Sequence, residues 1–105
     1  MQITDKTILI IAPHTDDGEL GCGGTIAKLC EEGNRVYYIA FSSCNHSLPP
    51  SFESDTLKTE VKKAIAILGI AAENLILLDY SVREFKDNRQ SILDAMITLR
   101  EQYKP

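Results

Sequence analysis

The sequence lacks several features that would place the protein outside the ordinary globular class. No apolar run approaches the ~18–20 residues of a membrane-spanning helix. The N-terminus, MQITDKT, has neither the basic region nor the apolar region of a signal peptide, and the chain contains no low-complexity tract and no internal repeat. Because 44% of the residues are hydrophobic and 25% are charged, the composition is typical of a globular protein. We therefore expect one small, cytoplasmic domain over residues 1–105.

The basic residues and the cysteines argue against three further classes of protein. Eleven lysines and arginines face fifteen acidic residues, which gives a net charge of −4 and argues against a nucleic-acid-binding surface. Three cysteines, Cys22, Cys30 and Cys44, are an odd number, and no CxxC pair occurs. We expect reduced thiols rather than a disulfide framework or a zinc ribbon.

The hydrophobic pattern alternates between strands and helices along the chain. Buried or β-branched runs predict strands, and apolar residues at helical spacing predict helices. The expected strands cover residues 7–12, 35–42 and 74–80, and the expected helices cover residues 22–32, 55–68 and 88–103. This β-α-β-α-β-α order predicts an α/β fold, a Rossmann-like three-layer sandwich with a parallel sheet and right-handed crossovers.

The first strand, TILIIA, is apolar on both faces, as in a strand with neighbours on each side. A strand order of 3-2-1 would nevertheless leave it at an edge, where an apolar strand is an aggregation hazard. We therefore expect the chain to be the N-terminal half of a larger domain. The expected partner of this edge is the C-terminal part of that domain or a second copy of the chain.

The stretch APHTDDGELGCGGT, residues 12–25, follows the first strand. Ligands of open parallel sheets bind beyond the carboxyl ends of the strands. His14 and Asp17 have the right chemistry to bind zinc or another divalent metal, and the adjacent Asp16 could accept a proton from water. An aspartate that caps a helix and a glycine-rich turn explain the same residues without chemistry. Residue types alone leave both interpretations open.

The same stretch, read as APHTDDGELGCGGTIAKL, resembles the AHPDD motif of the PIG-L/LmbE-like family of zinc-dependent N-acetylglucosaminyl deacetylases. Further along, LKTEVKKAIAILGI, LLDYSVREF and RQSILDAM resemble later parts of the family in the same order. The resemblance implies zinc as the cofactor, with His14 and Asp17 as two ligands and Asp16 as the general base. It also implies hydrolysis of the acetamide of an N-acetylated amino sugar or a similar small molecule.

The sequence departs from the family pattern in two places. Thr15 stands where the family has proline. The third zinc ligand and a catalytic histidine belong to a later segment of the family that the 105 residues do not contain, so the isolated chain could be inactive. Residues that could contact substrate are Glu19, Ser42, His46 and Arg83, although capping of the helix is the favoured role of Glu19. His46 and Cys44 are alternative third ligands.

Two alternatives to a deacetylase stay open. One is a dinucleotide-binding module, but Gly21, Gly23 and Gly24 do not form a GxGxxG fingerprint. The second predicted strand also ends in AFSS, without the acidic residue that binds a ribose hydroxyl. The other alternative is a non-catalytic interaction module that docks on another chain through its first strand.

Overall fold

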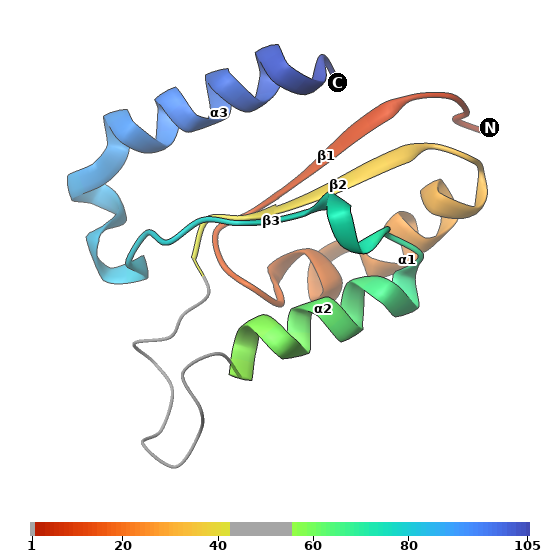
Figure 1. Ribbon diagram of the computed structural model, residues 1–105, viewed down its shortest axis with the longest axis horizontal. Coiled ribbons are helices and arrows are strands. Elements are labelled where there is room, and N and C mark those ends of the chain that lie inside the picture. Colours follow the sequence, from red (N-terminus) through yellow and green to blue (C-terminus); the bar gives the residue numbers. More distant parts are fainter. Residues whose placement is uncertain (1, 43–55) are drawn as a thin grey trace.

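The computed structural model describes residues 2–42 and 56–105. A parallel sheet separates two helices on one face from a third helix on the other (Figure 1). The strands, in spatial order, are β1 (Thr7–Ala12), β2 (Arg35–Ala40) and β3 (Leu75–Leu77). The α-helices are α1 (Asp17–Glu31), α2 (Thr56–Leu68) and α3 (Arg89–Tyr103). The predicted three-layer α/β architecture is confirmed, and β1 lies at an edge of the sheet, as expected.

Alternating side chains of β2 divide the interior into two hydrophobic cores. Successive residues of a strand point to opposite faces of the sheet, and both faces of β2 are covered by helices. The core toward α1 and α2 contains Val36, Tyr38, Ala40, Ile26, Leu29, Val61 and Ile65. The core toward α3 contains Ile39, Phe41 and Leu99. The central strand is thus buried on both sides, which explains its continuous run of β-branched and aromatic residues.

The edge strand β1 is covered less completely than its neighbour. Ile11 pairs with Ile39 in the parallel register. Ile39 is fully buried, whereas Ile11 is 45% exposed. The sequence of β1 is therefore typical of a strand with neighbours on both sides, but among the described residues β1 lies at an edge of the sheet.

The first helix begins earlier than the sequence predicts. We expected a start near Cys22, but α1 begins at Asp17, and a short helical segment that contains Gly18 and Gly21 precedes Cys22 despite the low helix propensity of glycine. Cys22 itself has non-helical backbone angles, φ −146° and ψ 30°, which kink the helix. The stretch after Cys22 corresponds to the helix that the apolar spacing indicates.

Two helices end at glycine as predicted. Gly33 (φ +86°) and Gly69 (φ +98°) adopt the left-handed conformation that favours glycine. The N–H groups of the following residues, Asn34 and Ile70, return to Leu29 and Ile65, five positions earlier. These hydrogen bonds satisfy carbonyl groups at the helix ends.

The segment around β3 is less regular than the sequence predicts. We expected a strand over residues 74–80, but β3 spans only Leu75–Leu77, and the short helix η2 (Ala72–Asn74) precedes it. Backbone hydrogen bonds nevertheless extend beyond β3, from Leu78 to Ala40 and from Tyr80 to Phe41. A second short helix, η3 (Val82–Asn88), then leads into α3 and was not predicted. Within the described ranges, none of the helices is long and apolar enough to span a membrane.

Candidate active site

The turn between β1 and α1 lies at the carboxyl end of the sheet, where the sequence predicted a site. Phe41 donates its N–H to the carbonyl of Ala12 at 3.0 Å, and Thr15 donates its N–H to the carbonyl of Ser42 at 3.2 Å. Thr15 and Ser42 are both 4% exposed. These contacts fix the turn against the end of β2.

His14 and Asp17 come together on this turn. The imidazole Nδ1 of His14 lies 3.1 Å from Oδ2 of Asp17, and the two side chains are 38% and 35% exposed. The same carboxylate oxygen accepts the backbone N–H of His14 at 3.1 Å. The two residues that the motif singles out as metal ligands are therefore in direct contact and open to solvent.

The surroundings of His14 show which of its ring nitrogens faces Asp17. Nδ1 also lies 3.0 Å from the carbonyl oxygen of Thr15, so both groups near this nitrogen are acceptors. In the metal-free chain a proton on Nδ1 satisfies both acceptors. Nδ1 is also the ring nitrogen that faces Oδ2 of Asp17, so it is the one that could bind the same metal ion as Asp17 once this proton is displaced. The donor set of His14 and Asp17 fits a zinc ion, although it supplies two ligands only.

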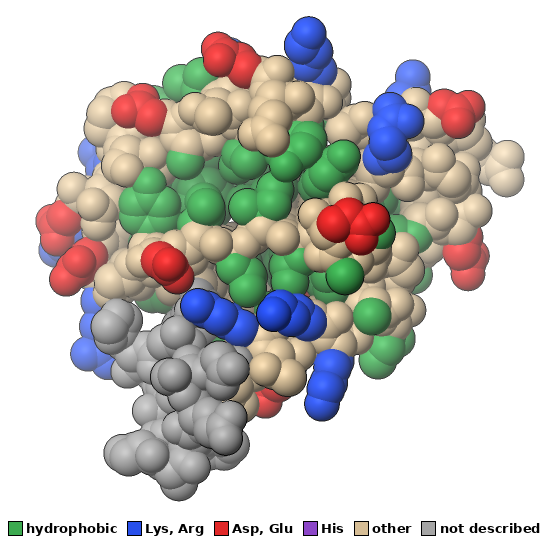
Figure 2. Space-filling view, viewed as in Figure 1, with side chains coloured by type: hydrophobic (Ala, Val, Ile, Leu, Met, Phe, Trp, Pro, Cys, Tyr) green, Lys and Arg blue, Asp and Glu red, His purple; other side chains and the backbone are tan. Residues whose placement is uncertain are grey.

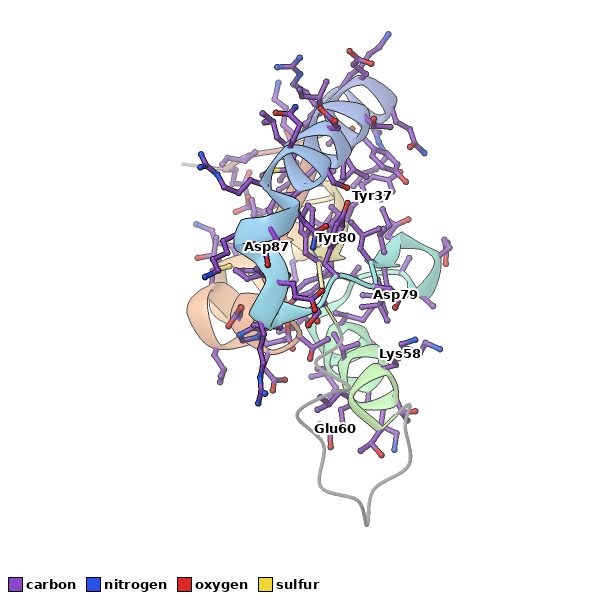
Figure 3. The ribbon with its side chains drawn as sticks, turned by 90° about the vertical axis from the view of Figure 1, so that its left-hand side faces the viewer. Tyr37, Lys58, Glu60, Asp79, Tyr80 and Asp87 are labelled. Atoms are coloured by element: carbon purple, nitrogen blue, oxygen red, sulfur yellow. The ribbon has the colours of Figure 1, made fainter. Side chains whose placement is uncertain are left out.

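A third ligand is missing from the part of the chain that the structure describes. No group of three or more His, Cys, Asp or Glu side chains that could hold a metal occurs there. His46 and Cys44, the alternative third ligands, lie outside the described residues. The loop after β3 carries Asp79, whose Oδ1 lies 3.9 Å from Nζ of Lys58 on α2 (Figure 3).

Asp16 occupies the N-cap position of α1 in a left-handed conformation, with φ +82° and ψ −27°. Non-glycine residues seldom adopt this conformation, although aspartate tolerates it better than most. The N–H of Asp16 donates to Oε2 of Glu19 at 3.1 Å, which is half of a capping box. Glu19 thus caps the helix, and its contact with a substrate stays a prediction.

Tyr38 of β2, which the sequence did not indicate as a site residue, contacts the turn from the hydrophobic core. Its side chain is fully buried, and its Oη accepts the N–H of Gly18 at 3.0 Å. Burial raises the pKa of Tyr38 strongly, and the hydrogen bond and charge of Glu19 raise it further. A Cβ atom on Gly18 would lie only 2.8 Å from Oη. The alternation of β2 predicts that Tyr38 points inward, but no short-range pattern links it to a turn twenty residues earlier.

The remaining predicted contacts lie at different places. Ser42 is buried and contacts the turn through its carbonyl group. Arg83 is exposed on η3. His46 lies outside the described residues. Contacts between these residues and a substrate stay predictions.

The start of α1 is poorly suited to a dinucleotide. Phosphate groups bind where a helix N-terminus offers free N–H groups and positive potential. Here the first turn carries the acidic residues Asp17 and Glu19, and the N–H groups of Asp16 and Gly18 already donate to side chains. This arrangement favours a cation over a phosphate.

Known proteins are similar to this chain in sequence and in fold. A diacetylchitobiose deacetylase of Thermococcus kodakarensis is 28% identical over 102 residues, which cover 92% of this chain and 38% of that protein. The solved structure of an N,N'-diacetylchitobiose deacetylase from Pyrococcus horikoshii, complexed with its inhibitor MPG, superposes with a TM-score of 0.74 at 26% identity. That match covers 93% of this chain and 38% of the solved chain.

The chain therefore spans somewhat more than a third of the length of these relatives. The model of the PIG-L family, described as GlcNAc-PI de-N-acetylase, matches residues 9–105. With nearly its whole length matched by this model, the chain belongs to the PIG-L family.

Proposed function

We propose that this chain carries the N-terminal part of the active site of a zinc-dependent de-N-acetylase. His14 and Asp17 are two of the metal ligands, and Asp16 is the general base. Another divalent metal could replace zinc at such a donor set. The contact between His14 and Asp17 at 3.1 Å supports the proposal, because it brings a nitrogen and an oxygen ligand together in a chain of a deacetylase family.

The residues of the turn have different roles in the proposed amide hydrolysis. Zinc, when bound, supplies a Lewis acid that polarises the acetamide carbonyl and makes water more acidic. His14 and Asp17 would hold it through Nδ1 and Oδ2, the two atoms that lie 3.1 Å apart. Asp16 takes a proton from the attacking water and returns it to the departing nitrogen. The C–N bond of the amide breaks, and acetate and a free amine leave.

The proposed substrate is an N-acetylated amino sugar. Both relatives are named for the deacetylation of diacetylchitobiose, and the family description names a GlcNAc lipid. The shared chemical group is the 2-acetamido sugar. The sugar ring beyond this group, and any lipid or second sugar attached to it, are left open by the proposal.

A zinc titration by calorimetry tests the metal site directly. We expect the 105-residue chain to bind one zinc ion, and we expect His14→Ala and Asp17→Asn to weaken binding at least about tenfold. Asp16→Asn is the matched control, because it changes an adjacent carboxylate of the same turn. This variant should keep its zinc affinity. Absence of binding, or binding that His14→Ala leaves unchanged, would show that the chain alone does not form the proposed metal site.

Release of free amine from N,N'-diacetylchitobiose tests the reaction. If the zinc-loaded chain is active, Asp16→Asn should lower turnover by at least about a hundredfold while zinc stays bound. Equal turnover by wild type and Asp16→Asn would refute the role of Asp16. Zinc binding without any turnover would restrict the deacetylase proposal to a longer protein that contains this chain.

A further inference from the structure

The buried tyrosine of the central strand contacts the start of the active-site helix. Tyr38 is fully buried in the core between the sheet and α1, yet its hydroxyl is polar and needs partners there. It accepts the N–H of Gly18 at 3.0 Å. Gly18 directly follows Asp17, so this hydrogen bond fixes the backbone next to a proposed metal ligand.

Glu19 connects the same tyrosine to the other side of the turn. Its carboxylate lies beside the Tyr38 hydroxyl, which still has a proton to donate. Its Oε2 accepts the N–H of Asp16 at 3.1 Å, and its Oε1 is buried without a well-aligned partner among the described residues. Tyr38 and Glu19 together thus contact the backbone on both sides of Asp17.

The turn has a conformation that needs such support. Asp16 is left-handed at φ +82°, and a strained residue persists only where its surroundings determine it. The backbone at Gly18 lies so close to the Tyr38 ring that a side chain would not fit. Neither Tyr38 nor Glu19 is one of the two proposed metal ligands.

We propose that Tyr38 and Glu19 are positioning residues, which hold the backbone of Asp16 and Gly18 so that His14 meets Asp17. The relevance of this role to catalysis rests on the proposed function, but the role itself is a property of the chain without metal. A packing role for Tyr38 would depend on its ring alone. The hydrogen-bonding role depends on its hydroxyl.

The test is NMR spectroscopy of the metal-free 105-residue chain. Tyr38→Phe removes the hydroxyl and keeps the ring. Tyr80→Phe is the matched control, because the Tyr80 hydroxyl bonds to Ser91 at 2.6 Å outside the turn. We expect Tyr38→Phe to speed hydrogen exchange at the Gly18 amide by at least about fivefold relative to core amides of β2. The Asp16 backbone and His14 ring nitrogen signals should shift as well.

A second pair of variants tests Glu19 by conservative rescue. Glutamine keeps a carbonyl oxygen that can accept the N–H of Asp16, as it does in other capping boxes, whereas alanine keeps none. We expect Glu19→Gln to preserve the Asp16 and His14 signals and Glu19→Ala to shift them. Such a result would assign the effect to the hydrogen bond rather than to charge.

Two results would overturn the positioning role. One is an exchange rate at Gly18 that rises only as much as the rates of the β2 core amides. The other is unchanged Asp16 and His14 signals in both Tyr38→Phe and Glu19→Ala. If Tyr38→Phe does not fold, Glu19→Ala and Glu19→Gln decide the question. Because no zinc or substrate is present, a failure of the deacetylase proposal leaves this result standing.

Discussion

At Gly18, the start of α1 comes so close to β2 that a side chain has no room. A Cβ atom would meet the Tyr38 ring and would lie 2.8 Å from its hydroxyl oxygen. Because the ring is buried on all sides, it cannot move away freely. We expect Gly18→Ala to lower the free energy of unfolding by about 1–3 kcal/mol, the usual effect of overpacking. Urea denaturation would measure it.

Gly24 provides the control within the same helix. It is exposed, and a Cβ atom there would meet nothing within 4 Å. Alanine is a better helix former than glycine by about 1 kcal/mol, so Gly24→Ala should stabilise the chain. Equal effects of the two substitutions would contradict the role assigned to the contact between Gly18 and Tyr38.

Thr15 replaces the proline of the family motif with a residue that can donate a hydrogen bond. Proline has no N–H and would restrain the turn through its ring. The N–H of Thr15 donates to the carbonyl of Ser42 at 3.2 Å, and this bond ties the turn to the end of β2. The departure from the motif is therefore accompanied by a different restraint on the same backbone.

At the level of single residues, sequence reasoning could identify the turn but not its support. His14 and Asp17 are three positions apart, so a turn brings them together by local geometry. Tyr38 is twenty residues from Gly18, and only the packing of α1 on β2 creates their contact. Local patterns carry little information about hydrogen bonds that depend on how two elements pack.

Among the elements, β2 contains Tyr38, whose hydroxyl makes the free energy of unfolding depend on pH in the alkaline range. Burial, then Glu19, raises the pKa of Tyr38 above its ordinary value. Above about pH 10 the unfolded chain releases the tyrosine proton, whereas the native chain keeps it. The native state then binds more protons, so the free energy of unfolding falls as pH rises from about 10 toward the raised native pKa.

Denaturation curves at several alkaline pH values would measure this dependence. Tyr38 should contribute a fall of up to about 1.4 kcal/mol per pH unit. Tyr38→Phe should show a shallower fall over the same range, while Tyr80→Phe should follow the wild type. If the curves of wild type and Tyr38→Phe run parallel, Tyr38 does not keep its proton as expected.

The sequence predicts helices and strands best where apolar residues recur at regular spacing and the regular stretch ends clearly. The strand over residues 7–12 and the helices of residues 55–68 and 88–103 agree with β1, α2 and α3 within one residue at each end. The start of α1 was wrong by five residues, because glycines obscure the helical pattern there. The length of β3 was also wrong, because its apolar run continues into residues that bond to β2 without regular strand geometry.

At the scale of the whole molecule, apolar side chains lie uncovered between α3 and the sheet on the side that Figure 2 shows. Another apolar face is open between α3 and the edge strand β1. A hollow of about 710 Å³ lies along η3 and α3, and a smaller pocket of about 160 Å³ adjoins Ile11 and Phe41. Ile11, Leu93 and Met96 are 45%, 48% and 39% exposed. Large apolar patches of this kind mark interaction surfaces or aggregation hazards.

We expect the isolated chain to self-associate through this face. Sedimentation should show a mass that rises with concentration, and the double variant Ile11→Lys, Met96→Lys should reduce the rise. Ile67→Lys is the control, since Ile67 is 87% exposed and belongs to α2, the helix on the other face of the sheet from α3 (Figure 1). A monomeric wild type at high concentration would contradict both this prediction and the hypothesis of an interaction module.

The left-handed backbone of Asp16 lowers the stability of the folded chain at a position where the proposed chemistry needs a carboxylate. A glycine adopts φ +82° without steric cost, whereas other residues cost roughly 1–2 kcal/mol in this region. The sequence that would fold most securely at position 16 is therefore not the one that supplies a carboxylate. If Asp16 is the base that we propose, selection for thermal robustness alone would erode the active site at this residue first. A stabilised descendant with glycine here would be a more durable scaffold and a poor catalyst.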